Sequence, residues 1–108
     1  MSATLERVRS CLVSSEVRIS RHGGAELRAD GIALAEILAS ATTSMLVEDY
    51  VDAFKGPSIL ALHRLSDGRP VHVVWGFAKG TTTPAVLVTA YRPEPRRWST
   101  DFLTRRSL

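Results

Sequence analysis

Apolar residues recur at helical spacing in the first part of the chain and alternate with polar residues in the later part. The elements that this pattern predicts are helices over residues 4–14, 25–29 and 33–41, strands over 16–20 and 45–50, and three more strands within 57–92. Thr4 is expected to cap the first helix, and residues 51–56 are expected to form a loop. Because helices come early and a β-meander comes late, the pattern predicts an α+β fold with helices packed on a mainly antiparallel sheet.

Turn sequences between the last three strands predict which residues face each other. Asp67-Gly68 suits a two-residue hairpin turn, which would place His63 opposite His72. A three-residue turn with a bulge would break this match. Centring the next connection on residues 79–84 places His72 opposite Tyr91. The expected result is a row of three polar side chains, His63, His72 and Tyr91, on one face of the sheet.

Alternation along the strands assigns their side chains to two faces. The expected helix-packed face is wholly apolar and carries Val71, Val73, Trp75 and Phe77. On the last strand Leu87, Thr89 and Tyr91 are expected to share the other face. That mixed face is either a functional groove or an ordinary, partly exposed sheet surface.

Composition indicates one ordinary globular domain with an excess of arginine. The 108 residues are 44% hydrophobic and 23% charged, with a net charge of +3, and 12 of the 14 basic residues are Arg. We expect a single domain with its core at about 16–92 and a basic tail at 93–108. A single cysteine, Cys11, excludes an internal disulfide, and no apolar run is long enough to span a membrane. A cytoplasmic protein without a cofactor is the expectation.

Several short blocks of sequence resemble one uncharacterised bacterial family. They are Ser20-Arg21-His22, Glu48-Asp49-Tyr50, Pro57-Ser58-Ile59-Leu60, Gly68-Arg69-Pro70-Val71-His72-Val73-Val74 and Thr89-Ala90-Tyr91-Arg92-Pro93. They are similar to that domain-of-unknown-function family's S-R-H, E-D-Y, P-S-x-L, G-R-P-L-H-V-V and T-x-Y-x-P blocks, and with Trp98 they cover about residues 16–98. His63 departs from the pattern, because the family is expected to have a small or apolar residue there.

The family in turn resembles, distantly, the RelE, BrnT and MqsR toxin ribonucleases. The resemblance implies a RelE/BrnT-like toxin fold, cleavage of RNA on the sheet face, and a partner antitoxin of the zinc-finger or helix-turn-helix type.

Residue chemistry is compatible with metal-independent RNA cleavage, which needs a base, an acid and positive charge at the phosphate. The candidate catalytic residues are His22, His72, Tyr91 and Arg69, and the candidate RNA-binding residues are Arg21, His63, Arg92, Arg96 and Arg97. Each has a structural alternative. His22 could cap a helix, Arg69 could pair with Asp67 or Glu48, and the tail arginines could form a solvated edge.

The sequence is also compatible with other functions. A histidine pair is too small a ligand set for a stable metal site, and no phosphate loop or nucleophile elbow is present. The same sheet face could belong to a non-catalytic module that binds a protein or RNA, or to a small-molecule sensor. The toxin-like ribonuclease is the first hypothesis, and the binding module is its alternative.

Overall fold

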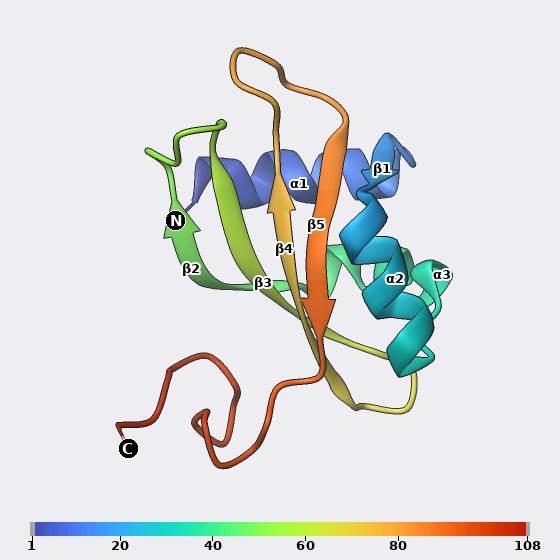
Figure 1. Cartoon of the computed structure of the whole chain (residues 1–108), viewed down its shortest axis with the longest axis vertical. Coiled ribbons are helices and arrows are strands. Elements are labelled where there is room, and N and C mark those ends of the chain that lie inside the picture. Colours follow the sequence, from blue (N-terminus) through green and yellow to red (C-terminus); the bar gives the residue numbers. More distant parts are fainter. Residues whose placement is uncertain (1, 108) are drawn as a thin grey trace.

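The protein folds as helices packed on a five-stranded open sheet, which confirms the α+β prediction (Figure 1). The computed structural model describes residues 2–107. Its helices are α1 (Ala3–Val13), α2 (Arg21–Asp30), α3 (Leu34–Ala39) and the 3₁₀ turn η1 (Ala41–Thr43). Its strands are β1 (Val17–Ile19), β2 (Met45–Tyr50), β3 (Ser58–Arg64), β4 (Pro70–Gly76) and β5 (Ala85–Tyr91).

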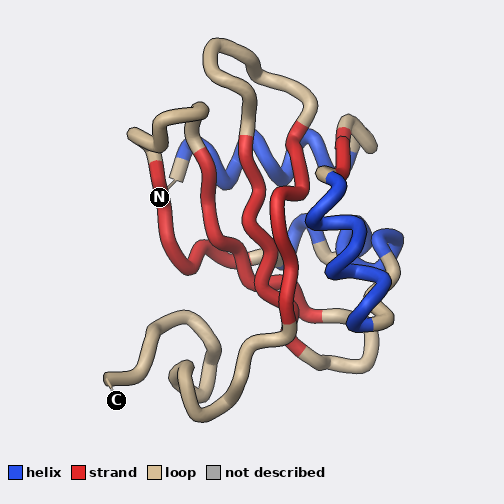
Figure 2. Tube along the Cα trace, viewed as in Figure 1, coloured by secondary structure: helices blue, strands red, loops and turns tan. Residues whose placement is uncertain are grey.

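The strands lie in the order β1-β5-β4-β3-β2, and only β1 runs parallel to its neighbour. Helix α1 crosses behind the strands, and α2 lies alongside β5 (Figures 1 and 2). The helix-packed face is the apolar one expected from alternation, because Val71, Val73, Trp75 and Phe77 are all buried in the core. We call the opposite face of the sheet the front face.

Helix boundaries follow from capping side chains. Ser2, rather than Thr4, caps α1, because its hydroxyl accepts a hydrogen bond from the Leu5 amide at 3.0 Å. Ser20 caps α2 by accepting from the Gly23 amide at 2.9 Å, so this helix begins at Arg21, earlier than the apolar pattern predicted. Gly31 ends it with a left-handed φ of 63°.

The hairpin between β3 and β4 has a three-residue turn, so the predicted pairing of His63 with His72 is wrong. The Leu65 amide donates to the Arg69 carbonyl at 3.0 Å, and Gly68 takes a φ of 83°. This is the bulged turn that shifts the register by one residue. His63 therefore faces Val71, and His72 faces Leu62. The two histidines lie on opposite faces of the sheet.

The pairing between β4 and β5 confirms the second predicted pair, because His72 lies opposite Tyr91. Farther along the strands, the register shifts between Val74 and Trp75. Because of this bulge Leu87 and Ala90 both reach the helix-packed core, and Leu87 does not share a face with Tyr91 as alternation predicted.

Candidate functional site

The candidate site is the His72–Tyr91 pair at the lower end of the front face. The Tyr91 hydroxyl lies 3.1 Å from Nδ1 of His72, and the two rings meet edge to face at 5.3 Å. The other imidazole nitrogen, Nε2, lies 2.9 Å from the carbonyl oxygen of Phe102. A carbonyl can only accept, so the neutral ring donates from Nε2 and accepts the Tyr91 proton at Nδ1.

Burial sets the protonation of both groups. His72 is fully buried, and desolvation lowers its pKa, only partly opposed by the hydrogen bond to Phe102. Desolvation raises the pKa of Tyr91. The pair therefore consists of a neutral imidazole and a protonated phenol at neutral pH, joined by one hydrogen bond.

The C-terminal tail covers the pair. Trp98 is 3% exposed and stands perpendicular to the His72 ring, with ring centroids 4.4 Å apart. The spacing of Trp98, Phe102 and Arg105 fits one side of a short helix, but the tail does not form one. Instead Trp98 and Arg105 form an isolated antiparallel bridge, and Phe102 at the turn takes a φ of 62°. This strained conformation of a bulky residue directs the Phe102 carbonyl at His72. We call residues 98–105 the tail loop (Figure 2).

An ion pair anchors the tail loop to the edge strand β2. Arg105 donates from two nitrogens to the Glu48 carboxylate, at 3.0 and 3.2 Å. The Tyr50 hydroxyl also donates to Glu48. The bond from Arg105, and after it the bond from Tyr50, lowers the pKa of Glu48. Desolvation, and after it the hydrogen bond to Glu48, raises the pKa of Tyr50 to about 12. Arg64 adds a cation–π contact, 5.8 Å from the centre of the Phe102 ring.

His63 has a different environment on the helix-packed face. It is fully buried, Trp75 Nε1 donates to its Nε2 at 3.0 Å, and its Nδ1 lies 2.8 Å from the Ser40 hydroxyl. Because Trp75 can only donate, the ring proton of neutral His63 must be on Nδ1. Desolvation lowers the pKa of His63 to about 4. His63 is therefore remote from the proposed RNA face, although the sequence suggested it as an RNA-binding residue.

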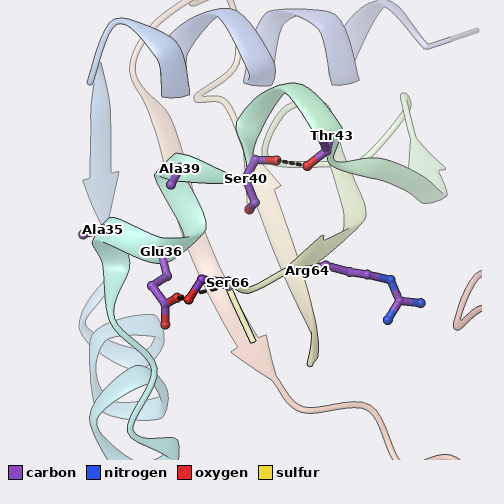
Figure 3. Close-up of a pocket in the computed structure, with 7 residues that line it drawn as sticks. All are labelled: Ala35, Glu36, Ala39, Ser40, Thr43, Arg64 and Ser66. Carbon is purple, nitrogen blue, oxygen red and sulfur yellow. Dashed lines mark hydrogen bonds between the residues drawn. The ribbon is translucent and has the colours of Figure 1, made fainter. Parts of the chain in front are cut away.

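A hollow of about 380 Å³ lies beside Ser40, between α3 and the β3–β4 hairpin (Figure 3). Glu36 and Ser66 are hydrogen-bonded at its rim, and Arg64 extends away from both (Figure 3). Ser40 and His63 together resemble a nucleophile and its base. The tautomer excludes that role, because His63 donates to Ser40 and has no free lone pair to take its proton.

The other predicted site residues are spread around the molecule. His22 is 72% exposed at the start of α2, and its Nε2 lies 3.1 Å from Glu26. Glu26 in turn accepts from the Thr89 hydroxyl and the Ala90 amide on β5, and the Thr89 bond is the main cause of its lowered pKa. His22 is thus linked through the Glu26 carboxylate to β5, the strand that carries Tyr91.

Among the described residues, none of the predicted arginines forms a hydrogen bond or cation–π contact with the side chains of His72 or Tyr91. Arg69 bonds Asp67 in the turn at 2.7 Å, and Arg92 donates to the Asp30 carbonyl at the end of α2. Arg96 and Arg97 both pair with Glu94, and Arg21 is exposed on α2. Arg105 and Arg64 instead contact aromatic rings of the tail loop that covers the pair, and neither was predicted as a site residue. Arg64 shares the strand face of Leu62, so the correct register would have indicated it.

Within residues 2–107, no three His, Cys, Asp or Glu side chains lie close enough together to hold a metal ion. In the same range no helix has the length and apolar character needed to cross a membrane.

Comparison with known proteins gives one match. A family model described as a domain of unknown function (DUF4258) matches residues 19–92. No curated protein and no solved structure matches the chain. The matched range includes His72 and Tyr91 and stops before the tail loop.

Proposed function

The chain belongs to the DUF4258 family, and from its geometry we propose that it is a toxin-like, metal-independent endoribonuclease. The observation that carries the proposal is the hydrogen bond between the Tyr91 hydroxyl and Nδ1 of the neutral His72 ring. A hydroxyl bonded to a neutral imidazole has the arrangement of an activated nucleophile or proton relay.

In this proposal Tyr91 and His72 act together as the general base. Tyr91 takes the proton of a ribose 2′-hydroxyl while its own proton moves to Nδ1 of His72. The 2′-oxygen then attacks phosphorus, the bond to the 5′-oxygen breaks, and a 2′,3′-cyclic phosphate forms. A lowered His72 pKa keeps the imidazole neutral and able to accept, and a raised Tyr91 pKa keeps the transferable proton in place.

The leaving 5′-oxygen needs a proton, and we assign this role to His22. His22 is solvent-exposed beside the Glu26 carboxylate, which is fixed to Thr89, two residues before Tyr91. Thr89 and Tyr91 point to the same side of β5 and are separated by about 7 Å, so the His22–Glu26 pair is tied to the stretch of strand that carries Tyr91. Arg64, on β3, supplies the positive charge at the phosphate, in place of the predicted Arg69 and Arg92.

The tail loop must move aside for RNA to reach the pair, because His72 is fully buried beneath Trp98. The loop lies outside the residues that match the family. We therefore place it outside the catalytic domain, as a cover over the site.

RNA cleavage by the purified protein in EDTA tests the proposal. We expect cleavage to fall at least about 100-fold in Tyr91→Phe and in His72→Ala, and growth arrest on expression to be relieved by the same changes. Tyr50→Phe is the matched control, since it removes the other tyrosine hydroxyl on the front side and should leave cleavage unchanged. Absence of cleavage by the wild type and by Trp98→Ala, across several RNAs, would refute the enzyme.

A second candidate, the non-catalytic binding module, is favoured by one observation. Both nitrogens of His72 are already hydrogen-bonded within the protein, as in a structural histidine. This candidate predicts RNA or protein binding without cleavage, and binding that survives Tyr91→Phe.

A further inference from the structure

We propose that the upper half of the front face is a docking surface for an acidic segment of a partner protein, anchored by an aliphatic side chain. This inference does not depend on the proposed ribonuclease activity. The surface contains a hollow of about 360 Å³, well away from the tail loop. Val74, Val86 and Val88 line it from β4 and β5, and Arg18 and Lys55 line it from its two sides.

The walls of the hollow are fixed by close backbone packing. Gly56 has a φ of 123°, and a Cβ atom there would lie 2.2 Å from the Phe77 carbonyl oxygen. Only glycine can bring the β2–β3 loop this close to β4. The Phe77 amide also donates to the Pro57 carbonyl at 3.0 Å. Lys55 is therefore carried on a loop that is held against the sheet.

The charges of the hollow favour an acidic partner. Its two charged residues, Arg18 and Lys55, are both cations, and no acidic residue lines it. In the part of the chain that the structure describes, neither forms an ion pair, whereas arginines 9, 69, 96, 97 and 105 each pair with a carboxylate. Two unpaired cations across an apolar floor are complementary to carboxylates that flank an aliphatic residue.

The apolar surface is too broad for a small anion alone. Phe54 is 91% exposed, Val51 61% and Val88 41%, so exposed apolar side chains continue from the hollow onto the adjoining loop. Contiguous exposed apolar residues rimmed by charge are typical of protein interaction sites.

The observations favour a peptide over a nucleic acid. Single-stranded bases are bound mainly by stacking on aromatic or arginine faces. Here the floor is aliphatic, Phe77, which also lines the hollow, is only 3% exposed, and the exposed Phe54 lies on the adjoining loop outside the lining. Valine side chains instead suit the Leu, Ile or Val anchor of an extended peptide.

A selection from a library of random 12-residue displayed peptides tests the inference on the intact protein. Peptides retained by the wild type are counter-selected against an Arg18→Glu/Lys55→Glu double variant. The expected peptides carry Asp or Glu on both sides of an aliphatic residue. Failure to enrich any peptide, or enrichment of basic or purely aromatic ones, would overturn the proposal.

A labelled peptide from the selection then gives the size of the effect. We expect the double variant to weaken its binding at least tenfold, and Val88→Asp to do the same. An Arg28→Glu/Arg96→Glu variant has the same net charge as the double variant but changes exposed residues outside the hollow, so it should bind nearly as well as wild type. Equal losses in the two variants, with both folded by circular dichroism, would show a charge effect without a site. Binding of a labelled single-stranded RNA that is lost only in the hollow variant would identify a nucleic-acid site instead.

Discussion

His63 and His72 are both fully buried on neighbouring strands, and both accept a hydrogen bond at one nitrogen while the other nitrogen is engaged. They differ in what covers them. The helix-packed core encloses His63, whose partners Ser40 and Trp75 belong to separate elements. One loop of the C-terminal tail encloses His72. Burial alone therefore does not separate a structural histidine from a candidate catalytic one, whereas the ease of uncovering it does.

The largest expected effect comes from removing the His63 side chain. We expect His63→Ala to lower the free energy of unfolding by about 3–5 kcal/mol, because it leaves a cavity and unpaired groups on Trp75 and Ser40. His72→Ala should cost less, about 1–2 kcal/mol, because the tail loop can settle into the space. Denaturant unfolding measures both, and equal losses would remove the distinction between the two sites.

Lowering the pH should also destabilise the folded protein through His63. Its folded pKa of about 4 lies below the ordinary value of 6.5, so the unfolded chain binds more protons between these pH values. Stability should therefore be complete above pH 6.5 and fall by roughly 3 kcal/mol as the pH drops to 4. The lowered pKa of His72 adds to the loss in the same direction.

The control for the acid prediction is His63→Gln. Its amide can accept from Trp75 and donate to Ser40, but it does not titrate. Stability measured by denaturant at each pH should show a shallower slope between pH 6.5 and 4 in this variant. An unchanged slope would assign the acid sensitivity to other groups.

Trp98→Ala should uncover His72 and leave His63 enclosed. We expect a stability loss of about 1–3 kcal/mol, below that of a core tryptophan, since only the tail loop is released. The pKa of His72 should rise toward its ordinary value as solvent reaches the ring. Titration of the three histidines by NMR gives the comparison, with His22 as the exposed reference. A His72 resonance that does not change its titration would mean that the loop stays in place.

The smallest expected effect is that of the ion pair that anchors the loop. Arg105→Gln should cost at most about 1 kcal/mol, because the Arg105 side chain is 62% exposed and screened by solvent. A double-mutant cycle with Glu48→Gln isolates the pair, whose coupling should shrink as salt is added. A coupling energy that does not change with salt would contradict a solvent-screened ion pair.

Much of the fold could be predicted from periodicity, but the register of one hairpin could not. Strand β3 is apolar on both faces, with Ile59 and Ala61 on one and Leu60 and Leu62 on the other. Either register would bury apolar residues against Val73, so the pattern did not choose between them. The length of the turn sets the register instead, and Asp67-Gly68 suits both two- and three-residue turns.

The candidate site was predictable in part. The His72–Tyr91 pair followed from the centre of the second loop and is confirmed by their register. The contacts of Arg105 with Glu48 were not predictable, since they join residues 57 positions apart. The pairing of Arg69 with Asp67 was one of the alternatives open from sequence, and it is observed.

Surface turns usually tolerate deletions, and the turn at residues 66–68 should do so, because losing one residue leaves a two-residue turn closed by the same Leu65–Arg69 pair. Arg64, just before that pair, is also exposed, but deleting it would move every earlier residue of β3 by one position along β4. The Trp75 indole would then lose its acceptor, and His63 would move from the core to the side of His72. In the evolution of this chain, the effect of a single deleted codon at this hairpin would thus depend on whether it falls inside the turn or one residue outside it.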